Sequence, residues 1–181
     1  MGAETVRVKG DVKIPDGETV RFGLIVFGDL TSGENVKFLD GLHVEGTLRL
    51  GDFNSVKGSV HCEGNMMIGR QTTIEEAVYS LGILLVGKGA RIGIGENGGG
   101  VVCDSEAYVE QEFTVREKLL AEKIITVEKL SEELMSRLDK ERPKPKHRKE
   151  SSAIRTGVQE RTDSRKVDWQ KTEHKGTISP G

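Results

Sequence analysis

Two histidines, His43 and His61, stand 18 residues apart, and Tyr79 follows at the same spacing. If these positions form one column on a regular structure, the two imidazoles could bind zinc or act as a general base. A tetrahedral zinc site needs a third protein ligand, and His147 and His174 lie far along the chain. We therefore interpret His43 and His61 as stacked surface side chains. They are the only candidate metal ligands, and no cofactor is expected.

The segment GIGENG, residues 93–98, matches the dinucleotide-binding pattern G-x-G-x-x-G. That chemistry requires a helix directly after the loop, whose N-terminus meets the pyrophosphate. Here Gly99, Gly100 and the extended sequence VVCD follow, so we predict a glycine-rich turn of the fold and no nucleotide site. No carboxylate pair is spaced for hydrolysis, and Cys62 and Cys103 form no metal or redox motif. The chain is not expected to be an enzyme.

A short phrase returns every 18 residues, as VKGDV at 8–12, VFGDL at 26–30 and VEGTL at 44–48. The spacing persists in CEGNM at 62–66 and in SLGIL at 80–84. A fixed period of this length indicates one structural unit that is stacked repeatedly. The central glycines, continued by Gly100, are Gly10, Gly28, Gly46, Gly64 and Gly82.

Apolar residues occupy fixed columns of this repeat, always an even number of positions after the glycine. One such column contains Val12, Leu30, Leu48, Met66, Leu84 and Val102, and another contains Cys62. Because the intervening positions are mostly polar, each repeat is predicted to form three short strands with alternate side chains facing inward. Large residues such as Leu24 and Leu42, four positions after an aliphatic column, favour a right-handed coil. The fold expected for residues 5–110 is therefore an all-β, parallel, right-handed β-helix of about six 18-residue turns.

The phrases VKGDVKI, VFGDLTS and VEGTLRL resemble the repeated signature of the bactofilins, a family of polymer-forming cytoskeletal proteins. The resemblance covers about residues 5–100. It implies a right-handed, roughly triangular β-helix that assembles end to end into filaments without a bound nucleotide, as a scaffold for cell shape or for positioning other proteins. Two features differ from the family: the long segment after the repeat and the absence of an apolar membrane-targeting start.

The two ends of a β-helix carry strands whose backbone groups lack a partner, and such edges recruit other chains unless they are covered. Repeated contacts between ends build open filaments. The chain is therefore predicted to bind copies of itself through its end turns. The apolar residues assigned to this polymer interface are Val6, Val8, Val12, Ile14, Leu84, Val86, Ile92 and Val102.

The period changes in residues 111–141, which are predicted to be helical. Thr114 and Glu117 match a capping box, and apolar residues then recur at three- and four-residue steps. The stripe is expected to pack on the end or the side of the coil. The alternative is a coiled coil or a partner-docking helix, with Ser131 as its weak point. A helix over the open end would oppose polymerisation there. The residues of this stripe are Leu120, Ile124, Val127, Leu134 and Leu138.

Charge separates residues 142–181 from the rest of the chain. Residues 1–141 contain 16 Lys and Arg against 24 Asp and Glu, whereas residues 142–181 contain 11 against 5. The second segment has too few apolar residues to fold alone and is predicted to be a disordered basic tail. It is a candidate contact for an anionic membrane surface or another protein, through Lys144, Lys146, Arg148 and Lys149.

No apolar run is long enough to span a membrane, and the first residues do not resemble a signal peptide. We therefore expect a cytoplasmic protein, membrane-associated only through its tail, that binds no nucleic acid. Two alternatives to a self-assembling scaffold stay open. One is a trimeric hexapeptide-type β-helix enzyme, an acyltransferase or a zinc hydratase that would use His43 and His61. The other is a capped β-helix adaptor that binds another protein and never polymerises.

Overall fold

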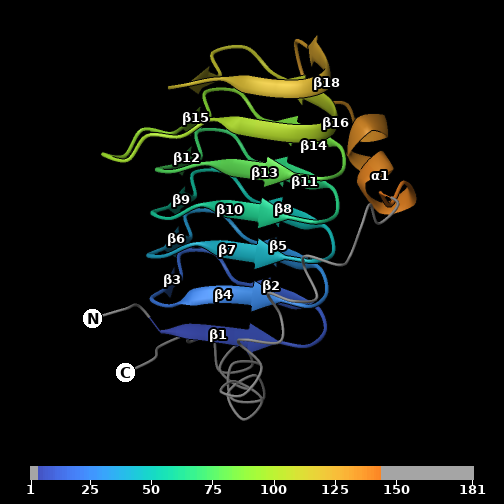
Figure 1. Cartoon of the computed structure of the whole chain (residues 1–181). Coiled ribbons are helices and arrows are strands. Elements are labelled where there is room, and N and C mark those ends of the chain that lie inside the picture. The colour runs from blue at the N-terminus through green and yellow to red at the C-terminus, as the bar shows by residue number, and fades with distance from the viewer. Residues whose placement is uncertain (1–3, 144–181) are drawn as a thin grey trace.

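The computed structural model describes residues 4–143, which form one parallel β-helix with a single helix against its side (Figure 1). A turn of the coil contains three short strands, and these strands pair in parallel with the strands of the next turn. The predicted β-helix is therefore confirmed. It has about seven turns, one more than the repeat in the sequence predicts.

The strands lie on three faces of the coil. The first face contains β1 (Thr5–Val8), β4 (Gly23–Val26), β7 (Leu42–Val44), β10 (Val60–Cys62) and β13 (Val78–Ser80). The second face contains β2 (Val12–Ile14), β5 (Leu30–Ser32), β8 (Leu48–Leu50), β11 (Met66–Ile68) and β14 (Leu84–Val86). The third face contains β3 (Thr19–Val20), β6 (Lys37–Phe38), β9 (Ser55–Val56), β12 (Thr73–Ile74), β15 (Arg91–Ile92) and β17 (Thr114–Val115). In the last two turns, the first and second faces are joined because the long strands β16 (Val101–Val109) and β18 (Leu119–Thr126) run across both.

Alternate side chains point into the coil, as the apolar columns predict. On the first face, for example, Val6 is in register with Leu24, and Leu24 with Leu42. These inward columns form one continuous hydrophobic core that reaches from the first turn to Val109. Cys62 has no exposed surface, which confirms its assignment to the core.

From Gly28 onward, the central glycines of the repeat are required because successive turns approach closely. A Cβ on Gly64 would lie 2.3 Å from the carbonyl oxygen of Gly46, and one on Gly46 would lie 2.6 Å from that of Gly28. Any larger residue would therefore overlap the backbone of the preceding turn. None of these three glycines has a positive φ. The requirement is for space and not for backbone freedom.

Left-handed backbone occurs at a different corner of the coil, between the second and third faces. One residue per turn there has a φ between 53° and 76°: Gly17, Asn35, Phe53, Gln71, Gly89 and Glu112. For a residue other than glycine this conformation costs roughly 1 kcal/mol. It is held by hydrogen bonds to the next turn, such as Asn35 N–H to the Asp52 carbonyl oxygen at 3.0 Å. Since four of the six residues are not glycine, residue type alone does not show which position of this corner is left-handed.

One turn is longer than the others. Val78 is in register with Val101, and Leu84 with Ala107, so this turn contains 23 residues rather than 18. The additional residues lie in the loop between β15 and β16, which contains GIGENG and projects from the coil (Figure 1). The prediction that Val102 continues an inward column is therefore wrong, because the longer turn shifts it into register with Tyr79 on the outer surface.

Residues 113–126 form strands, so the helix predicted over them is wrong. Thr114 lies in β17 and does not cap a helix, and β18 pairs with β16 to make a further turn. Leu119 and Ala121 are in register with Val101 and Cys103 of the preceding turn. Pairing with β16 satisfies backbone groups that a helix would otherwise satisfy internally. This tertiary pairing outweighs the helical period that the same residues also fit.

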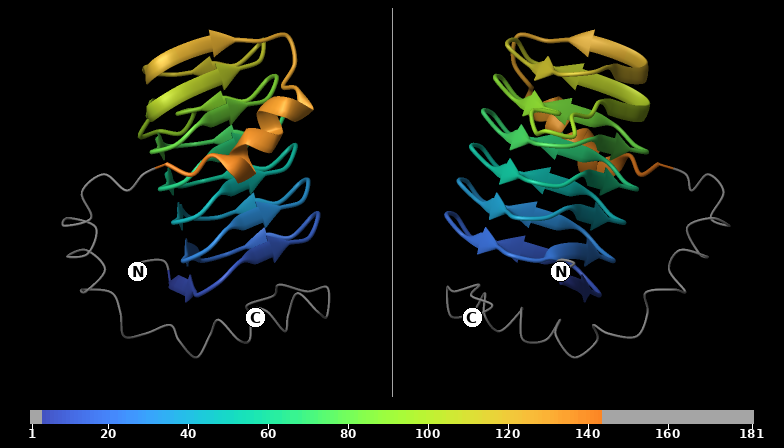
Figure 2. Two further views of the ribbon diagram at one scale, coloured as in Figure 1. Left: turned by 90° about the vertical axis from the view of Figure 1, so that its right-hand side faces the viewer. Right: turned by 60° about the vertical axis from the view of Figure 1, so that its left-hand side comes forward.

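The only helix in residues 4–143 is α1 (Glu132–Lys140), and it lies along the second face rather than over the C-terminal end (Figures 1 and 2). Ser131, the supposed weak point of the apolar stripe, is its N-cap, because Ser131 Oγ accepts a hydrogen bond from Leu134 N–H at 3.1 Å. Figure 2 shows α1 crossing several turns obliquely. The coil thus extends to Thr126 instead of ending near residue 110, and the helical segment is confined to the residues after it.

Candidate assembly surfaces

The N-terminal end of the coil has an open backbone edge. Within residues 4–143, β1, β2 and β3 pair only with β4, β5 and β6 of the second turn. The apolar side chains of this turn point inward and are buried, so the edge itself is formed by the strands' backbone groups. The buried residues include four of the predicted interface: Val6, Val8, Val12 and Ile14.

The C-terminal end is open as well, and it exposes apolar side chains. In the described part of the chain, β18 pairs only with β16, and β17 only with β15. Ile124 is in register with Ala107 and Leu84, so it continues an inward column beyond the last buried turn, and it is 49% exposed. Other apolar residues of this end are partly buried against the core: Phe113, Val115, Leu119 and Ala121. These four residues and Ile124 are called the C-terminal rim below.

Three residues of the predicted interface lie too far from the end to take part in it. Leu84, Val86 and Ile92 have no exposed surface and are covered by the next turn, where they are in register with Ala107, Val109 and Val115. The prediction is wrong for them because the coil continues to Thr126, beyond the repeat in the sequence. Val102 is also excluded, since it lies on the outer face.

The predicted helical stripe divides between two environments. Leu134 and Leu138 lie on α1, and together with Val127 they pack on the second face. Their partners from the coil in this cluster are Met67, Ile83, Leu85, Tyr108 and Ile125. The prediction that the stripe packs on the side of the coil is therefore confirmed for these three residues. It is wrong for Leu120 and Ile124, which lie in β18 and are 55% and 49% exposed.

Hydrogen bonds fix both ends of the segment that carries α1. At its start, the buried carboxylate of Glu110 accepts bonds from Leu130 N–H and Lys88 N–H, each at 2.6 Å. At its end, Asn65 Nδ2 donates to the Leu138 carbonyl oxygen at 3.1 Å and also to the Glu141 carbonyl oxygen. The sequence pattern marked neither residue.

Arg137 joins α1 to the sixth turn. Its guanidinium donates to Tyr108 Oη at 2.7 Å and lies 3.4 Å from Glu106 Oε2. It also forms a bidentate ion pair with Glu141, the residue directly after α1. The hydrogen bond from the Tyr108 hydroxyl lowers the pKa of Glu106, and Arg137 lowers it further. A second ion pair connects Arg49 on β8 to Asp139 at 2.6 Å.

The outer surface of the first face carries His43, His61 and Tyr79 in one column, as the 18-residue spacing predicts. The rings of His43 and His61 stack with their centroids 4.7 Å apart. Burial lowers the pKa of His61, and the neighbouring His43 lowers it further. Glu63 Oε1 lies 3.3 Å from His43 Nε2. Within residues 4–143, no three His, Cys, Asp or Glu side chains are grouped to hold a metal ion.

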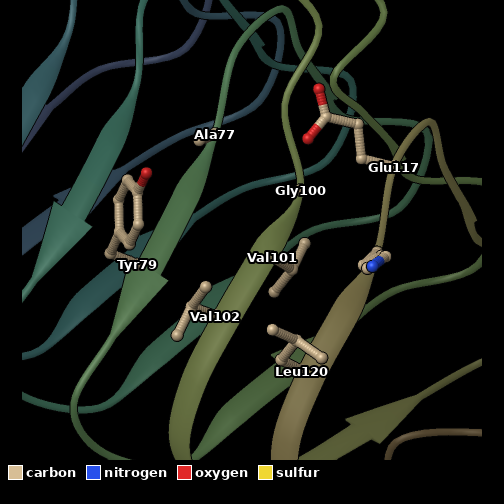
Figure 3. Close-up of a pocket in the computed structure, with 8 residues that line it drawn as sticks. Ala77, Tyr79, Gly100, Val101, Val102, Glu117 and Leu120 are labelled. Carbon is tan, nitrogen blue, oxygen red and sulfur yellow. The ribbon is translucent and has the colours of Figure 1, made fainter.

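The same column becomes apolar in the last turns. Tyr79, Val102 and Leu120 line a shallow pocket together with Ala77, Gly100 and the stems of Glu117 and Lys118 (Figure 3). Tyr79 is 43% exposed. Apolar side chains of one outer column form most of its lining, so the geometry offers a contact surface.

Four predicted contacts, Lys144, Lys146, Arg148 and Lys149, lie outside the described residues. In the part of the chain that is described, no helix is both long and apolar enough to cross a membrane. The chain matches no family model, no curated protein and no solved structure. The fold therefore defines a β-helix protein in which residues 4–143 leave both ends of the coil open, and any function must be argued from those ends and from the faces between them.

Proposed function

We propose that this chain is a self-assembling, nucleotide-independent scaffold whose β-helical rods stack end to end into filaments. The cellular task would be the one implied by the resemblance to bactofilins, namely support of cell shape or positioning of other proteins in the cytoplasm. The chain would bind copies of itself without a cofactor, and it would not be an enzyme. The basic tail would add contacts with an anionic membrane surface or another protein.

The observation that carries the proposal is the C-terminal rim. Its residues continue the columns of the core. A second coil stacked against them would bury them in the way that each turn of the coil buries the turn before it. The same contact would supply partners for the open backbone edge of β18. Burial of apolar area stabilises such a contact by about 25 cal/mol per Å². A trimeric enzyme would not need apolar residues at the end of its coil.

The experiment compares two charged variants of β18. In Ile124→Glu the charge is placed in an inward column at the rim, whereas in Leu120→Glu it is placed on the outer surface of the same strand. The two wild-type side chains are similarly exposed, at 49% and 55%, so the variants differ chiefly in the direction that the charge faces. A charge at Val8 would be less informative, because that side chain is fully buried and the coil itself would be destabilised.

Sedimentation velocity and negative-stain electron microscopy give the result. We expect filaments from the wild-type protein and from Leu120→Glu, and small discrete particles from Ile124→Glu, with unchanged far-UV circular dichroism in all three. Discrete particles from the wild-type protein at every concentration would overturn the proposal. Filaments from Ile124→Glu would show that the C-terminal rim is not part of the contact between rods.

A further inference from the structure

The last turn of the coil is held weakly by its own side chains. No residue of β18 is fully buried, since no later turn covers it within residues 4–143. Leu119 and Ala121 are only partly buried against the core. The strand is therefore retained mainly by its backbone pairing with β16. A strand with one free edge and little burial is expected to open readily, as local unfolding begins where apolar contacts are few.

The segment after β18 turns back and fastens this strand to earlier turns. Val127 N–H donates to the Val109 carbonyl oxygen at 2.9 Å, immediately after β18 ends. The Glu110 carboxylate then holds Leu130 N–H at 2.6 Å, and Glu110 is only 4% exposed. On the outer side of β18, Ile125 packs in the same cluster as Tyr108 and Leu138. These contacts thus hold β18 on the side that belongs to the second face of the coil.

The helix that follows distributes this attachment over four further turns. Going back from the last turn, α1 contacts Tyr108 in the sixth turn, Leu85 in the fifth, Asn65 in the fourth and Arg49 in the third. Leu138 is fully buried in these contacts. Nine isolated helical residues are unstable in water, so α1 is helical because it is docked. Docking of the helix and order in the last turn are therefore coupled.

We propose that α1 is a strap that keeps β18 in register while it leaves the outer edge of β18 open for pairing. Release of the strap loosens the last turn and withdraws the ordered edge that a second coil would need. Docking of α1 thus promotes assembly, whereas a helix over the end of the coil would block it. This proposal rests on the proposed function for its effect on assembly, but its structural part does not.

The structural part is tested by hydrogen exchange in the full-length Ile124→Glu protein, which is expected to be unassembled. In this background, Arg137→Ala removes the contacts to Tyr108 and Glu106, and Leu138→Ala removes the buried side chain of α1. The control is Glu133→Gln, at an exposed position in the first turn of the same helix. We expect exchange of the β18 amides to be at least about tenfold faster in the first two variants, with β4, β7 and β10 unchanged.

Unchanged exchange in β18 in both variants would overturn the strap, and so would equal acceleration throughout the coil. The assembly part is tested by Arg137→Ala and Glu133→Gln without the charged rim. We expect the critical concentration for filaments to rise at least about fivefold in Arg137→Ala only. An equal or lower critical concentration would overturn this part. If the wild-type protein forms no filaments, the proposed function fails, and the exchange experiment still decides whether α1 orders the last turn.

Discussion

Asn65 Nδ2 donates a hydrogen bond to the main-chain carbonyl oxygen of Leu138, 3.1 Å away, while Asn65 Oδ1 accepts one from Ile83 N–H at 2.9 Å. A single buried amide thus joins the fourth turn to the fifth and to the end of α1. In the first two turns the same column holds Asp11 and Asp29, whose carboxylates accept from the N–H of the next turn. A carboxylate cannot also donate to a helix carbonyl, which explains asparagine where the helix ends.

We therefore expect Asn65→Asp to lower the free energy of unfolding by about 2 kcal/mol, because it removes a donor and places a charge beside carbonyl oxygens. The matched control is Asp29→Asn, which keeps the acceptor for Thr47 N–H and should change stability by less than about 0.5 kcal/mol. Urea denaturation followed by circular dichroism measures both values. Equal losses in the two variants would contradict this account of the column.

The stacked glycines predict a severe effect for a single added methyl group. In Gly64→Ala the new Cβ would lie 2.3 Å from the Gly46 carbonyl oxygen, so the two turns must separate. We expect a loss of about 3 kcal/mol or more, as for overpacking of a rigid core. Gly23→Ala is the control, since its Cβ would meet no backbone atom, only the side chains of Thr5 at 3.2 Å and Asp40 at 3.4 Å, and we expect a loss under about 1 kcal/mol. Similar midpoints in thermal unfolding for the two variants would argue against close contact between the turns.

The histidine column makes stability depend on pH. Burial and His43 lower the pKa of His61 in the folded protein below its ordinary value of 6.5. The unfolded chain then binds a proton more readily, so the contribution of His61 is complete above pH 6.5 and is lost as the pH falls through the folded pKa. Chemical denaturation should show a lower free energy of unfolding at pH 5.0 than at pH 7.5. In His61→Gln this difference should be smaller, and an unchanged difference would rule out His61 as its source.

The core cysteine should be unreactive in the folded protein. Burial raises the pKa of the Cys62 thiol to about 12, from an ordinary value of 9.0. Near neutral pH the thiolate fraction is then about a thousandfold lower than for an ordinary thiol, and the thiolate is the reactive form. Alkylation with iodoacetamide, followed by peptide mass spectrometry, should label Cys62 at least that much more slowly than in urea. Rapid labelling without denaturant would show that the fourth turn opens.

The sequence predicts the coil well where one residue type satisfies one physical need at a constant spacing. Close approach of turns allows only glycine, so positions such as Gly28 and Gly46 show the period directly. The left-handed corner is less visible, because Asn35 and Phe53 adopt the strained backbone with help from hydrogen bonds to the next turn. The 23-residue turn also hides the register, and the residues of the last turn consequently match a helical pattern.

The sequence predicts that the ends of the coil form the candidate surface, but it does not predict which residues lie at the C-terminal end. The expectation of open ends follows from the fold, yet the residues at the C-terminal end depend on where the coil stops. Residues 113–126 fit both a helical and a strand pattern, and only the exposed edge of β16 decides between them. Ile124 was therefore assigned to a helix, whereas it lies at the end of an inward column. Glu110 and Asn65 could not be assigned from the sequence, because their partners are main-chain groups of a distant segment.

The strap across the second face also limits how the rod can change in length. Its contacts run from Arg49 to Ile125, and the spacing of these residues along the coil must match the span from Val127 to Asp139. A whole repeat added or removed between Gly10 and Gly28 would leave that match intact. The same change between Asn65 and Tyr108 would move the attachments to Asn65 and Arg49 by one turn, while those to Tyr108 and Glu110 would stay in place. The N-terminal part of the rod is therefore a modular section of variable length, and the C-terminal part is a unit of fixed size.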